Sequence, residues 1–594
     1  MPIIVQKFGG TSVADPQKIL AAARKAIRAQ NEGNQVVMVV SAMGHSTDQL
    51  IDLANQITDR PPAREMDMLL STGEQVSVAL MAMAIHSLGA KAVSLTGAQI
   101  GIKTDATHTK ARIKSISTQR MQELLDEGNI VIAAGFQGID ENLNITTLGR
   151  GGSDTTAVAL AAVLRADACE IYTDVDGVYT TDPRVLPEAR RVSRISYDEM
   201  LELASLGAGV MHNRSIEFGK KYGVPIHVRN SQSDAPGTMI IAEPESIDQP
   251  VCGAAIMKDE ARVSVLGVPD VPGTSLDIFA RIAARNITVD MIVQNVGEGG
   301  HADISFTVPR DELKLTLEAV QDAISQLGSG EITHDINVAK VSAVGLGMAK
   351  QTGVAQKFFR ALADADVNIQ MITTSEIKIS TLIASDAAQK SLRAIHQAFH
   401  LDRPPAVPAP DLHAASAAQR AADAADVVSR LQGVDMEELF IDDISLDEKQ
   451  ARITISGVPD TPGVAAKVFD EVAAAGIFVD MIVQSHSGKG QASLSFTVPQ
   501  TKLKESLEVT NRLAKAFACK SVSSSPQVAK LSVSGVGLRS HTSVAIRMFR
   551  ALAEAGINLE LISTSEVQVN VIVDGKQGQQ ALQRLQSAFG DVVR

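Results

Sequence analysis

The sequence contains no tryptophan, and aromatic residues make up only 3% of its 594 residues. Proteins that bind single-stranded nucleic acid stack the bases on aromatic side chains, so this scarcity argues against that function. The 55 basic and 68 acidic residues give a formal charge of −13, which also disfavours a nucleic acid or an anionic membrane as the partner. A local basic pocket for a phosphate group is still compatible with this charge.

Cysteine is scarce as well, and long apolar runs are missing. Cys169, Cys252 and Cys519 lie far apart and belong to no CxxC or Cys/His pattern, so we expect neither a disulfide framework nor a zinc site. No run approaches the ~18 uninterrupted apolar residues of a membrane span. The N-terminal residues show no signal or transit pattern. We therefore expect a cytoplasmic protein with no membrane partner.

Residues 1–245 alternate strand-like runs with helical periods, and they form the first predicted domain. A chain of this length is expected to contain about four domains at ~150 residues each. Val- and Ile-rich runs separated by helices predict an α/β fold with a mostly parallel open sheet sandwiched by helices. The expected strands are at 3–9, 35–42, 92–97, 129–136, 169–175 and 225–229.

The remainder of the chain is a repeat with a displacement of 190 residues. VLGVPDVPG at 265–273 returns as ISGVPDTPG at 455–463, and NIQMITTSE at 368–376 returns as NLELISTSE at 558–566. Each copy contains a weaker internal echo with the order βαββαβ. We therefore predict four ferredoxin-like βαββαβ modules, arranged as one pair at 251–400 and another at 439–594. A Pro-rich and then Ala-rich linker at 401–438 joins the pairs.

Three glycine-rich segments follow predicted strands: KFGGTS (7–12), SAMGHST (41–47) and TLGRGGSD (147–154). Ligands of open α/β sheets bind at the carboxyl ends of the strands. Glycines there let backbone N–H groups face an anion, and a following helix adds its positive end. Lys7 adds a point charge, although a single lysine after a strand also fits a solvated surface charge. We expect Ser153 or Asp154 to cap the helix after the third segment.

The segment TDVDGVYTTDPRV (173–185) combines carboxylates at a strand end with an aromatic and a basic residue. It fits a nucleotide site, and it fits an ordinary Asp-Gly turn equally well. The sequence has no GxxxxGK[ST] segment, so a P-loop is excluded. It also lacks the glycine-rich loop, VAIK-type lysine and HRD segment of protein kinases.

Five motifs together resemble those of the aspartate kinase family in the amino-acid kinase superfamily: KFGGTSVAD, SAMGHSTDQL, STGEQVS, TTLGRGGSDTTA and YTDVDGVYTTDPR. The tail with its repeated VPDxPG resembles ACT regulatory domains, although many family members carry two of them rather than four. The resemblance implies transfer of the γ-phosphoryl group of ATP, with Mg²⁺, to the side-chain carboxylate of L-aspartate. The product would be 4-phospho-L-aspartate, the first step towards lysine, threonine and methionine.

The resemblance also implies roles for individual residues of the first domain. Glu74 would meet the ammonium of aspartate, and Arg150 would take its α-carboxylate in a bidentate contact, or would be another phosphate ligand. No separate metal site is implied. The catalytic residues would be Lys7, Arg150 and Asp154; the substrate residues Ser41, Thr47, Glu74 and Arg150; and the nucleotide residues Lys7, Phe8, Gly9, Gly10, Thr173, Asp174, Tyr179, Arg184 and Lys220.

By the same resemblance, regulatory lysine and threonine would bind at seams between paired ACT modules. We also expect a homodimer through these domains, and the sequence does not assign an effector to a seam. The same residues fit simple caps of helices and turns. The candidates are Asp270, Asp290, Met291, Gln294, Asn368, Ile369, Ser375 and Glu376 in the first copy, and Asp460, Asp480, Met481, Gln484, Asn558, Leu559, Ser565 and Glu566 in the second.

Three alternatives stay open at this point. The enzyme can be another acyl- or phosphate-kinase of the same superfamily, such as a glutamate kinase. The chain can be an amino-acid sensor with an inactive kinase-like domain. The tail can also be an oligomerisation scaffold that binds no ligand.

Overall fold

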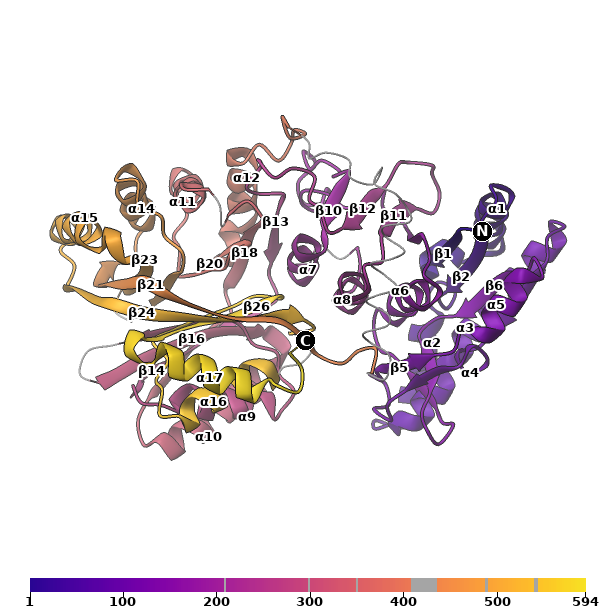
Figure 1. Cartoon of the computed structure of the whole chain (residues 1–594), viewed down its shortest axis with the longest axis horizontal. Helices are drawn as coiled ribbons and strands as arrows, with labels where there is room; N and C mark the ends of the chain where they lie inside the picture. Colours follow the sequence, from indigo (N-terminus) through magenta and orange to yellow (C-terminus); the bar gives the residue numbers. More distant parts are fainter. Residues whose placement is uncertain are drawn as a thin grey trace.

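The computed structural model describes residues 1–207, 210–296, 300–348, 351–407, 435–486, 490–538 and 543–593. It shows an N-terminal α/β domain beside a regulatory region of stacked sheets and helices (Figure 1). The N-terminal domain is built on an eight-stranded sheet with the order β10-β12-β11-β9-β1-β2-β6-β3. The chain continues from this sheet into the regulatory region after β12.

The large sheet confirms the predicted mostly parallel arrangement. Among its described pairs, β11 and β12 run antiparallel, and the others run parallel. All six expected strands are present, whereas the short strands β10, at the edge of the sheet, and β12, next to it, were not expected. The strands are β1 (Ile3–Phe8), β2 (Gln35–Val40), β3 (Ala92–Leu95), β6 (Ile130–Ala134), β9 (Ala168–Thr173), β10 (Arg194–Ser196), β11 (Ile226–Asn230) and β12 (Thr238–Ile241).

Helices cover both faces of this sheet. Side chains that alternate along β1 and β2 pack on α1 and α3 at one face and on α6 and α8 at the other, as two buried clusters. Helix α3 is long and apolar enough to cross a membrane, but half of its apolar window is buried inside the domain, as in a core helix. The helices are α1 (Pro16–Asn31), α2 (Ser46–Ile57), α3 (Ala63–Ser87), α4 (Gly97–Ile100), α5 (Gln119–Asp126), α6 (Gly152–Leu164), α7 (Tyr197–Ser205) and α8 (Asn213–Tyr222).

A second, four-stranded sheet with the order β5-β4-β7-β8 stands beside the large one. Its last strand leads directly into the third glycine-rich segment and then into α6. This segment therefore follows a strand, as expected, but a strand of the small sheet. The strands are β4 (Ile102–Thr104), β5 (Ile113–Ile116), β7 (Gln137–Ile139) and β8 (Ile145–Thr147).

The first regulatory copy holds two modules, one inserted in the other. Module one is a complete βαββαβ unit: β14 (Glu260–Pro269), α9 (Thr274–Ala283), β15 (Asp290–Val296), β16 (His301–Pro309), α10 (Leu313–Leu327) and β17 (Glu331–Asp335). In module two, the described residues that follow the second helix, up to 407, form no strand. Its edge strand β13 (Gly253–Met257) comes from upstream and pairs with β18. The rest of module two is β18 (Val338–Val344), α11 (Val354–Asp364), β19 (Met371–Thr374), β20 (Lys378–Ala384) and α12 (Ala388–Ala398).

The second copy repeats this insertion with longer strands. The first half of β21 pairs with the second half of β24 in module four, and its second half pairs with β23 in module three. The ACT-like fold class is thus confirmed, while the modules are nested and not arranged in series as the sequence had suggested. The elements are β21 (Phe440–Pro459), α14 (Val464–Ala474), β22 (Ile482–His486), β23 (Gln491–Pro499), α15 (Leu503–Ala516), β24 (Ser521–Val536), α16 (Ser543–Glu554), β25 (Leu561–Thr564), β26 (Gln568–Asp574) and α17 (Gly578–Ala588).

The modules associate across the two copies. Strand β19 of module two pairs with β22 of module three, where Ile372 faces Gln484. This pairing joins modules two and three, and β21 and β24 continue the same ten-stranded sheet into module four. Strand β15 of module one packs against β25 of module four. The two resulting layers face each other through a buried apolar cluster: Met291, Val293, Val338, Met371, Leu382, Met481, Val483, Val528, Leu561 and Ile572.

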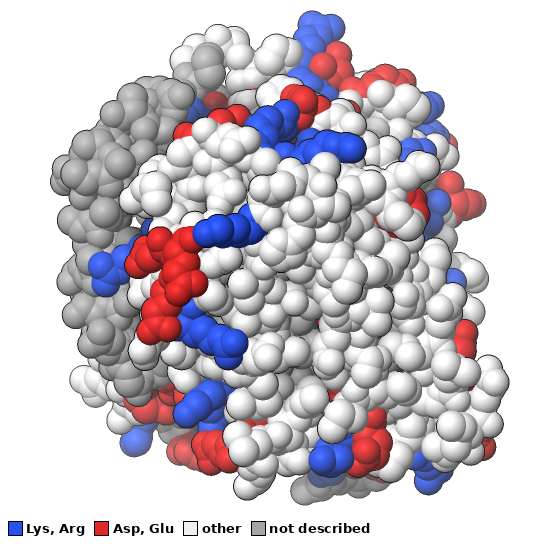
Figure 2. All heavy atoms as spheres, turned by 90° about the vertical axis from the view of Figure 1, so that its right-hand side faces the viewer, with Lys and Arg blue, Asp and Glu red and all other residues white. Residues whose placement is uncertain are grey.

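The surface of the N-terminal domain is partly apolar, whereas the surface of most of the linker is not described. Most of the predicted linker, residues 408–434, lies outside the described residues. The end of the N-terminal domain that faces away from the regulatory region carries few charged side chains near its centre (Figure 2). Helices α2 and α3 expose large apolar side chains to solvent: Leu53, Ile57, Val76, Leu80 and Met83.

We predict that the buried layer between the sheets stabilises the regulatory region. Leu561→Ala removes a fully buried side chain from this layer and is expected to lower the unfolding free energy by about 2–5 kcal/mol. Leu315→Ala on α10 is the matched control, because Leu315 is 49% exposed. Urea unfolding of both variants checks this, and equal midpoints would show that the layer contributes no packing energy.

Candidate active site

Lys7 and Asp154 meet where the large sheet ends. The neighbouring strands β9, β1 and β2 all end at this edge, and Lys7 is the last residue but one of β1. Its Nζ lies 2.5 Å from Oδ1 of Asp154 in the first turn of α6, and both side chains are only 12% exposed. The positive end of α6 also favours an anion here. The structure therefore brings together two of the three predicted catalytic residues.

The glycines after β1 allow two loops to touch through their backbones. A Cβ at Gly10 would lie 2.7 Å from the carbonyl oxygen of Ala42, and the amide of Gly44 donates to the Gly10 carbonyl at 3.0 Å. A Cβ at Gly9 would stand 3.4 Å from Nζ of Lys7, so a side chain there would crowd the ammonium. The predicted glycines thus leave the space above Lys7 open.

Phe8, a predicted nucleotide residue, has a different role for its side chain. It is fully buried and stacks on Tyr172 with a ring-centroid distance of 4.6 Å. Its carbonyl oxygen accepts a hydrogen bond from the amide of Ser41 at 3.1 Å. The ring belongs to the core, and only the Phe8 backbone lies at the strand end.

Glu74 offers a buried carboxylate to the same region. Its Oε1 accepts from the Ala42 amide at 3.1 Å, and its Oε2 is buried without a hydrogen-bond partner among the described residues. Burial is the main reason that the pKa of Glu74 is raised to about 7. A Cβ at Gly73 would lie 2.8 Å from that of Ala42, so this approach of α3 requires glycine. Two further substrate candidates, Ser41 and Thr47, lie in the same loop and the following turn of α2.

An aspartate that the sequence analysis missed, Asp67, forms hydrogen bonds next to the loop that carries Arg150. Asp67 on α3 is fully buried, accepts from the Thr147 hydroxyl at 2.5 Å and from the Thr109 amide at 3.0 Å, and contacts His108 Nδ1 at 2.6 Å. A carboxylate in the middle of an apolar helical period was the available signal. Asp67 therefore fixes the position of Thr147, the residue at the end of β8 from which the Arg150 loop begins.

The start of α6 differs from the expectation. The N-cap is Gly151, in a left-handed conformation at φ 76°, and no side chain caps the helix. Neither Ser153 nor Asp154 is the cap, because both lie inside the first turn of the helix. Asp154 is thereby free to face Lys7. Arg150 is exposed at the turn before the helix.

The nucleotide candidates are only partly brought together. Thr173 ends β9, and its hydroxyl donates to Asp174 Oδ1 at 3.1 Å. Tyr179 is half-buried in a β-bridge with Arg191. Arg184 is 87% exposed and pairs with Asp182 at 2.8 Å.

Lys220, a predicted nucleotide residue, forms ion pairs at the contact between α8 and the regulatory region. Its Nζ is 2.8 Å from Asp198 on α7 and 3.7 Å from Asp442 on the regulatory strand β21. The ammonium is thus committed to the contact between α8 and the regulatory region. We therefore leave Lys220 out of the proposed nucleotide site.

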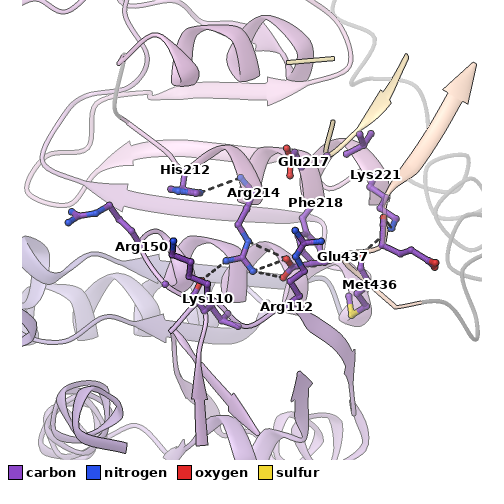
Figure 3. Close-up of a pocket in the computed structure, with 15 residues that line it drawn as sticks. Lys110, Arg112, Arg150, His212, Arg214, Glu217, Phe218, Lys221, Met436 and Glu437 are labelled. Carbon is purple, nitrogen blue, oxygen red and sulfur yellow. Dashed lines mark hydrogen bonds and ion pairs between the residues drawn. The ribbon is translucent and has the colours of Figure 1, made fainter. Parts of the chain in front are cut away.

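A cavity of about 300 Å³ opens beside the Arg150 loop, between the N-terminal domain and residues 436–438 (Figure 3). In the close-up, Arg214 points to Glu437, whereas the guanidinium of Arg150 extends away from both. The cavity therefore marks where the glycine-rich loop meets the second regulatory copy.

Half of the predicted regulatory residues form two equivalent sets across the seams. Between modules one and four, Asn558 Nδ2 donates to Asp270 Oδ1 at 2.7 Å. Between modules two and three, Asn368 Nδ2 donates to Asp460 Oδ1 at 2.8 Å. The amides of Gln294 and Gln484 donate across these seams to the carbonyls of Leu559 and Ile369 at 2.7 and 2.9 Å.

Most of the other candidates line two seam cavities. Asp290, Ser565 and Glu566 line one of about 90 Å³ between modules one and four. Ser375 and Asp480 line its counterpart of about 60 Å³ between modules two and three. The side chains of Met291 and Met481 lie in the apolar layer between the sheets instead. The side chain of Glu376 is 49% exposed, and its carboxylate lies 3.6 Å from the ammonium of Lys530.

Comparisons with known proteins agree with this architecture. The amino acid kinase family model matches residues 2–230. One ACT domain model matches residues 261–325, and another matches 341–399, 453–517 and 531–589. Together they define a class: a kinase domain of the amino acid kinase family followed by four ACT domains.

The relatives narrow this class. An aspartate kinase of Stutzerimonas stutzeri is 52% identical over 406 residues, which are 68% of this chain and 98% of the relative. An aspartokinase of Pseudomonas aeruginosa is 51% identical over 407 residues, which are 68% of this chain and 99% of that one. The chain therefore belongs to the aspartate kinase family.

Solved structures extend the likeness to the whole chain. The aspartate kinase from Synechocystis is 41% identical with a TM-score of 0.52 and covers 99% of this chain and 98% of its own. E. coli aspartokinase III in complex with aspartate and ADP is 25% identical with a TM-score of 0.57, over 67% of this chain and 100% of its own. A second structure of that protein is a complex with lysine and aspartate in the T-state. It is 25% identical with a TM-score of 0.53 and covers 67% of this chain and 99% of its own.

We predict that Glu74 makes folding stability depend on pH. Its folded pKa is raised to about 7, so stability is full below the pKa of the unfolded chain and declines as the pH rises through about 7. Glu74→Gln should reduce the loss of stability between pH 5 and pH 8 by up to ~3 kcal/mol. Denaturant unfolding at both pH values measures this, with Glu65→Gln, an exposed residue of the same helix, as control. Parallel losses in the wild type and in Glu74→Gln would contradict the raised pKa.

Proposed function

We propose that the chain transfers the γ-phosphoryl group of ATP to the side-chain carboxylate of L-aspartate, giving 4-phospho-L-aspartate and ADP. The observation that carries this proposal is the pair of opposite charges at one sheet edge. The Lys7 ammonium suits a phosphoryl group, and the unpartnered Oε2 of Glu74 suits the ammonium of an amino acid. The named relatives are aspartate kinases, which agrees with such an acceptor.

The transfer requires charge compensation and positioning. An oxygen of the acceptor carboxylate bonds to the γ-phosphorus while the bond to the β,γ-bridging oxygen breaks, and ADP leaves. The acceptor is already an anion, so no proton has to be removed. Lys7 neutralises charge on the transferred group, and Asp154 holds Lys7 in place.

Magnesium would accompany the nucleotide and neutralise its phosphates. The described residues contain no group of three or more His, Cys, Asp or Glu side chains that could hold a metal ion. Phosphate oxygens would therefore supply ligands, together with Asp154 or Asp174 from this chain, since Mg²⁺ is bound through few carboxylates plus substrate phosphates. Thr173, Tyr179 and Arg184 would complete the nucleotide site.

The acceptor would be held at both of its charged ends. Glu74 takes the ammonium, Arg150 takes the α-carboxylate, and Ser41 and Thr47 hydrogen-bond to the substrate. Because Arg150 is exposed on a glycine-flanked turn, its loop has to bring the guanidinium to the substrate. A glutamate acceptor would carry the same two charges at a longer spacing and is the alternative substrate.

Feedback by lysine and threonine at the ACT seams is the regulatory part of the proposal. The lysine-bound T-state structure of E. coli aspartokinase III supports lysine as an effector. The pathway towards lysine, threonine and methionine, a cytosolic location and a homodimer belong to the same proposal. Because β19 and β22 already pair within the chain, a second chain would have to use another ACT surface.

We predict that Lys7→Ala lowers kcat by at least ~10², because a charge that acts in the transition state is lost. ADP release in a coupled assay with aspartate and Mg-ATP measures the rate. Lys91→Ala, which removes an exposed lysine before β3, is the control and should keep full turnover. Unchanged turnover in Lys7→Ala would remove Lys7 from the catalytic role.

A panel of acceptors and effectors tests the substrate and the regulation. We expect aspartate to support ADP release well above glutamate and uridylate, because uridylate lacks an ammonium for Glu74 and glutamate places its carboxylate differently. Lysine and threonine, added singly and together, should inhibit. No aspartate-dependent ADP would favour the sensor with an inactive kinase domain, and full activity with both effectors present would favour the scaffold.

A further inference from the structure

The first turn of α8 lies against the loop that carries Arg150. A Cβ at Gly151 would fall 2.3 Å from the Cβ of His212, so His212 packs directly on the backbone of that loop. Two residues further on, Arg214 donates to the carbonyl of Leu148, at the start of the loop, and to that of Ala111 at 3.0 Å. A shift of this turn would therefore displace Arg150.

Asn213, between these two residues, contacts the regulatory region. Its Nδ2 donates to Oε2 of Glu566 at 3.0 Å, and the contact is largely buried because Glu566 is only 4% exposed. The amide of Glu566 donates to Oε1 of Glu202 on α7 at 2.9 Å, and Glu202 pairs with Lys378 of module two at 2.8 Å. The turn between β25 and β26 is thus attached firmly to the catalytic domain.

Glu566 also lines the seam cavity between modules one and four. The side chains that line this cavity include the carboxylates of Asp290 and Glu566 and the apolar residues Phe279, Ile287 and Phe549. The Asp290 carboxylate also pairs with the ammonium of Lys340. Such a lining suits an ammonium joined to an aliphatic body. One carboxylate therefore faces both a candidate effector site and the first turn of α8.

The repeated sequence provides an internal comparison. Glu376 occupies the position of Glu566 in the first copy, within the same Thr-Ser-Glu segment, but its side chain is 49% exposed. Its carboxylate lies 3.6 Å from the ammonium of Lys530 in module four, so this ion pair is within the regulatory region. The two copies have thus diverged at this glutamate, and the second one meets α8.

A second contact reaches the same turn from the segment just before the second copy. Glu437, three residues before β21, pairs with Arg214 through two of its nitrogens at 2.7 and 3.2 Å (Figure 3). Oε1 of Glu437 also accepts from the amide of Ile113 at 3.0 Å. His212 at the N-cap of α8, with Asn213 and Arg214 in its first turn, thereby joins the Arg150 loop to Glu566 of the second regulatory copy and to Glu437 just before that copy.

We propose that the first turn of α8 transmits effector binding from the seam of modules one and four to the Arg150 loop, with Asn213 and Arg214 as positioning residues. An amino-acid ammonium in the seam cavity draws the Glu566 carboxylate away from Asn213. The turn then shifts, and Arg150 holds the substrate carboxylate less well. The proposal rests on the function proposed above, because it assumes an amino-acid effector at the seam and aspartate at Arg150.

The experiment compares full-length wild type with Asn213→Ala. Initial rates over a range of aspartate concentrations, with and without lysine and threonine, give KM and kcat, and calorimetry gives effector binding. In the wild type we expect the effector to raise KM for aspartate by ~5-fold or more. In Asn213→Ala the effector should still bind but should change KM by less than ~2-fold, because the coupling is lost. Asn511→Ala, on the exposed face of α15, should keep the wild-type response.

Asn213→Asp gives a second test, because it is expected to imitate the effector, whereas Asn213→Ala is expected to remove the response to it. A carboxylate at this position repels Glu566 and should raise KM for aspartate without any effector, with the change in KM exceeding that in kcat. An effector response in Asn213→Ala equal to that of the wild type would overturn the transmission while leaving the proposed function intact. A wild type that neither lysine nor threonine inhibits would overturn both the transmission and the regulatory part of the proposed function.

Discussion

The ion pair between Lys7 and Asp154 joins the end of β1 to the start of α6, two segments that are far apart in the sequence. Because both groups are nearly buried, the pair fixes the position of the ammonium and of the helix terminus together. The open space above Gly9 then faces a positive charge that cannot move far. The rest of the proposed site follows from this constraint, since the loop after β2, Glu74 on α3 and the Arg150 loop are all arranged around the same sheet edge.

In the regulatory region, strands at the edges of the modules pair or pack with one another within the chain. Isolated ACT-like modules expose edges that invite pairing with another chain. Here β19 pairs with β22, and β15 packs against β25, so each seam combines one module from either copy. The curated relatives account for 68% of the chain, which leaves unmatched a length close to one copy of the repeat. A chain with both copies can thus assemble seams internally, and in the described residues the second copy and the segment just before it contact α8 through Glu566 and Glu437.

Local patterns were sufficient to predict the strands of the large sheet, the repeat and the glycine-rich ends, because strand periodicity and glycine spacing are local properties. The short strands β10 and β12 carry too few residues to show a pattern. Module one is inserted between β13 and β18, which pair with each other although they are far apart in the sequence. The periodicity of a sequence does not show which distant strands pair. The nucleotide role of Lys220 came from the family resemblance, and its ion pairs with Asp198 and Asp442 could not be predicted because these residues come together only in the folded chain. The same reason explains why Asn213 went unnoticed, whereas Asp67 could have been found as a carboxylate within an apolar helical stretch. The roles of Glu74 and Arg150 came from the family resemblance.

A crystal structure of the full chain with aspartate, Mg²⁺ and a non-hydrolysable ATP analogue tests the central claim most directly. The account predicts that the terminal phosphate lies within hydrogen-bonding distance of Nζ of Lys7 and that the ammonium of aspartate meets the carboxylate of Glu74. A terminal phosphate bound away from the end of β1, with Lys7 still paired only to Asp154, would contradict it.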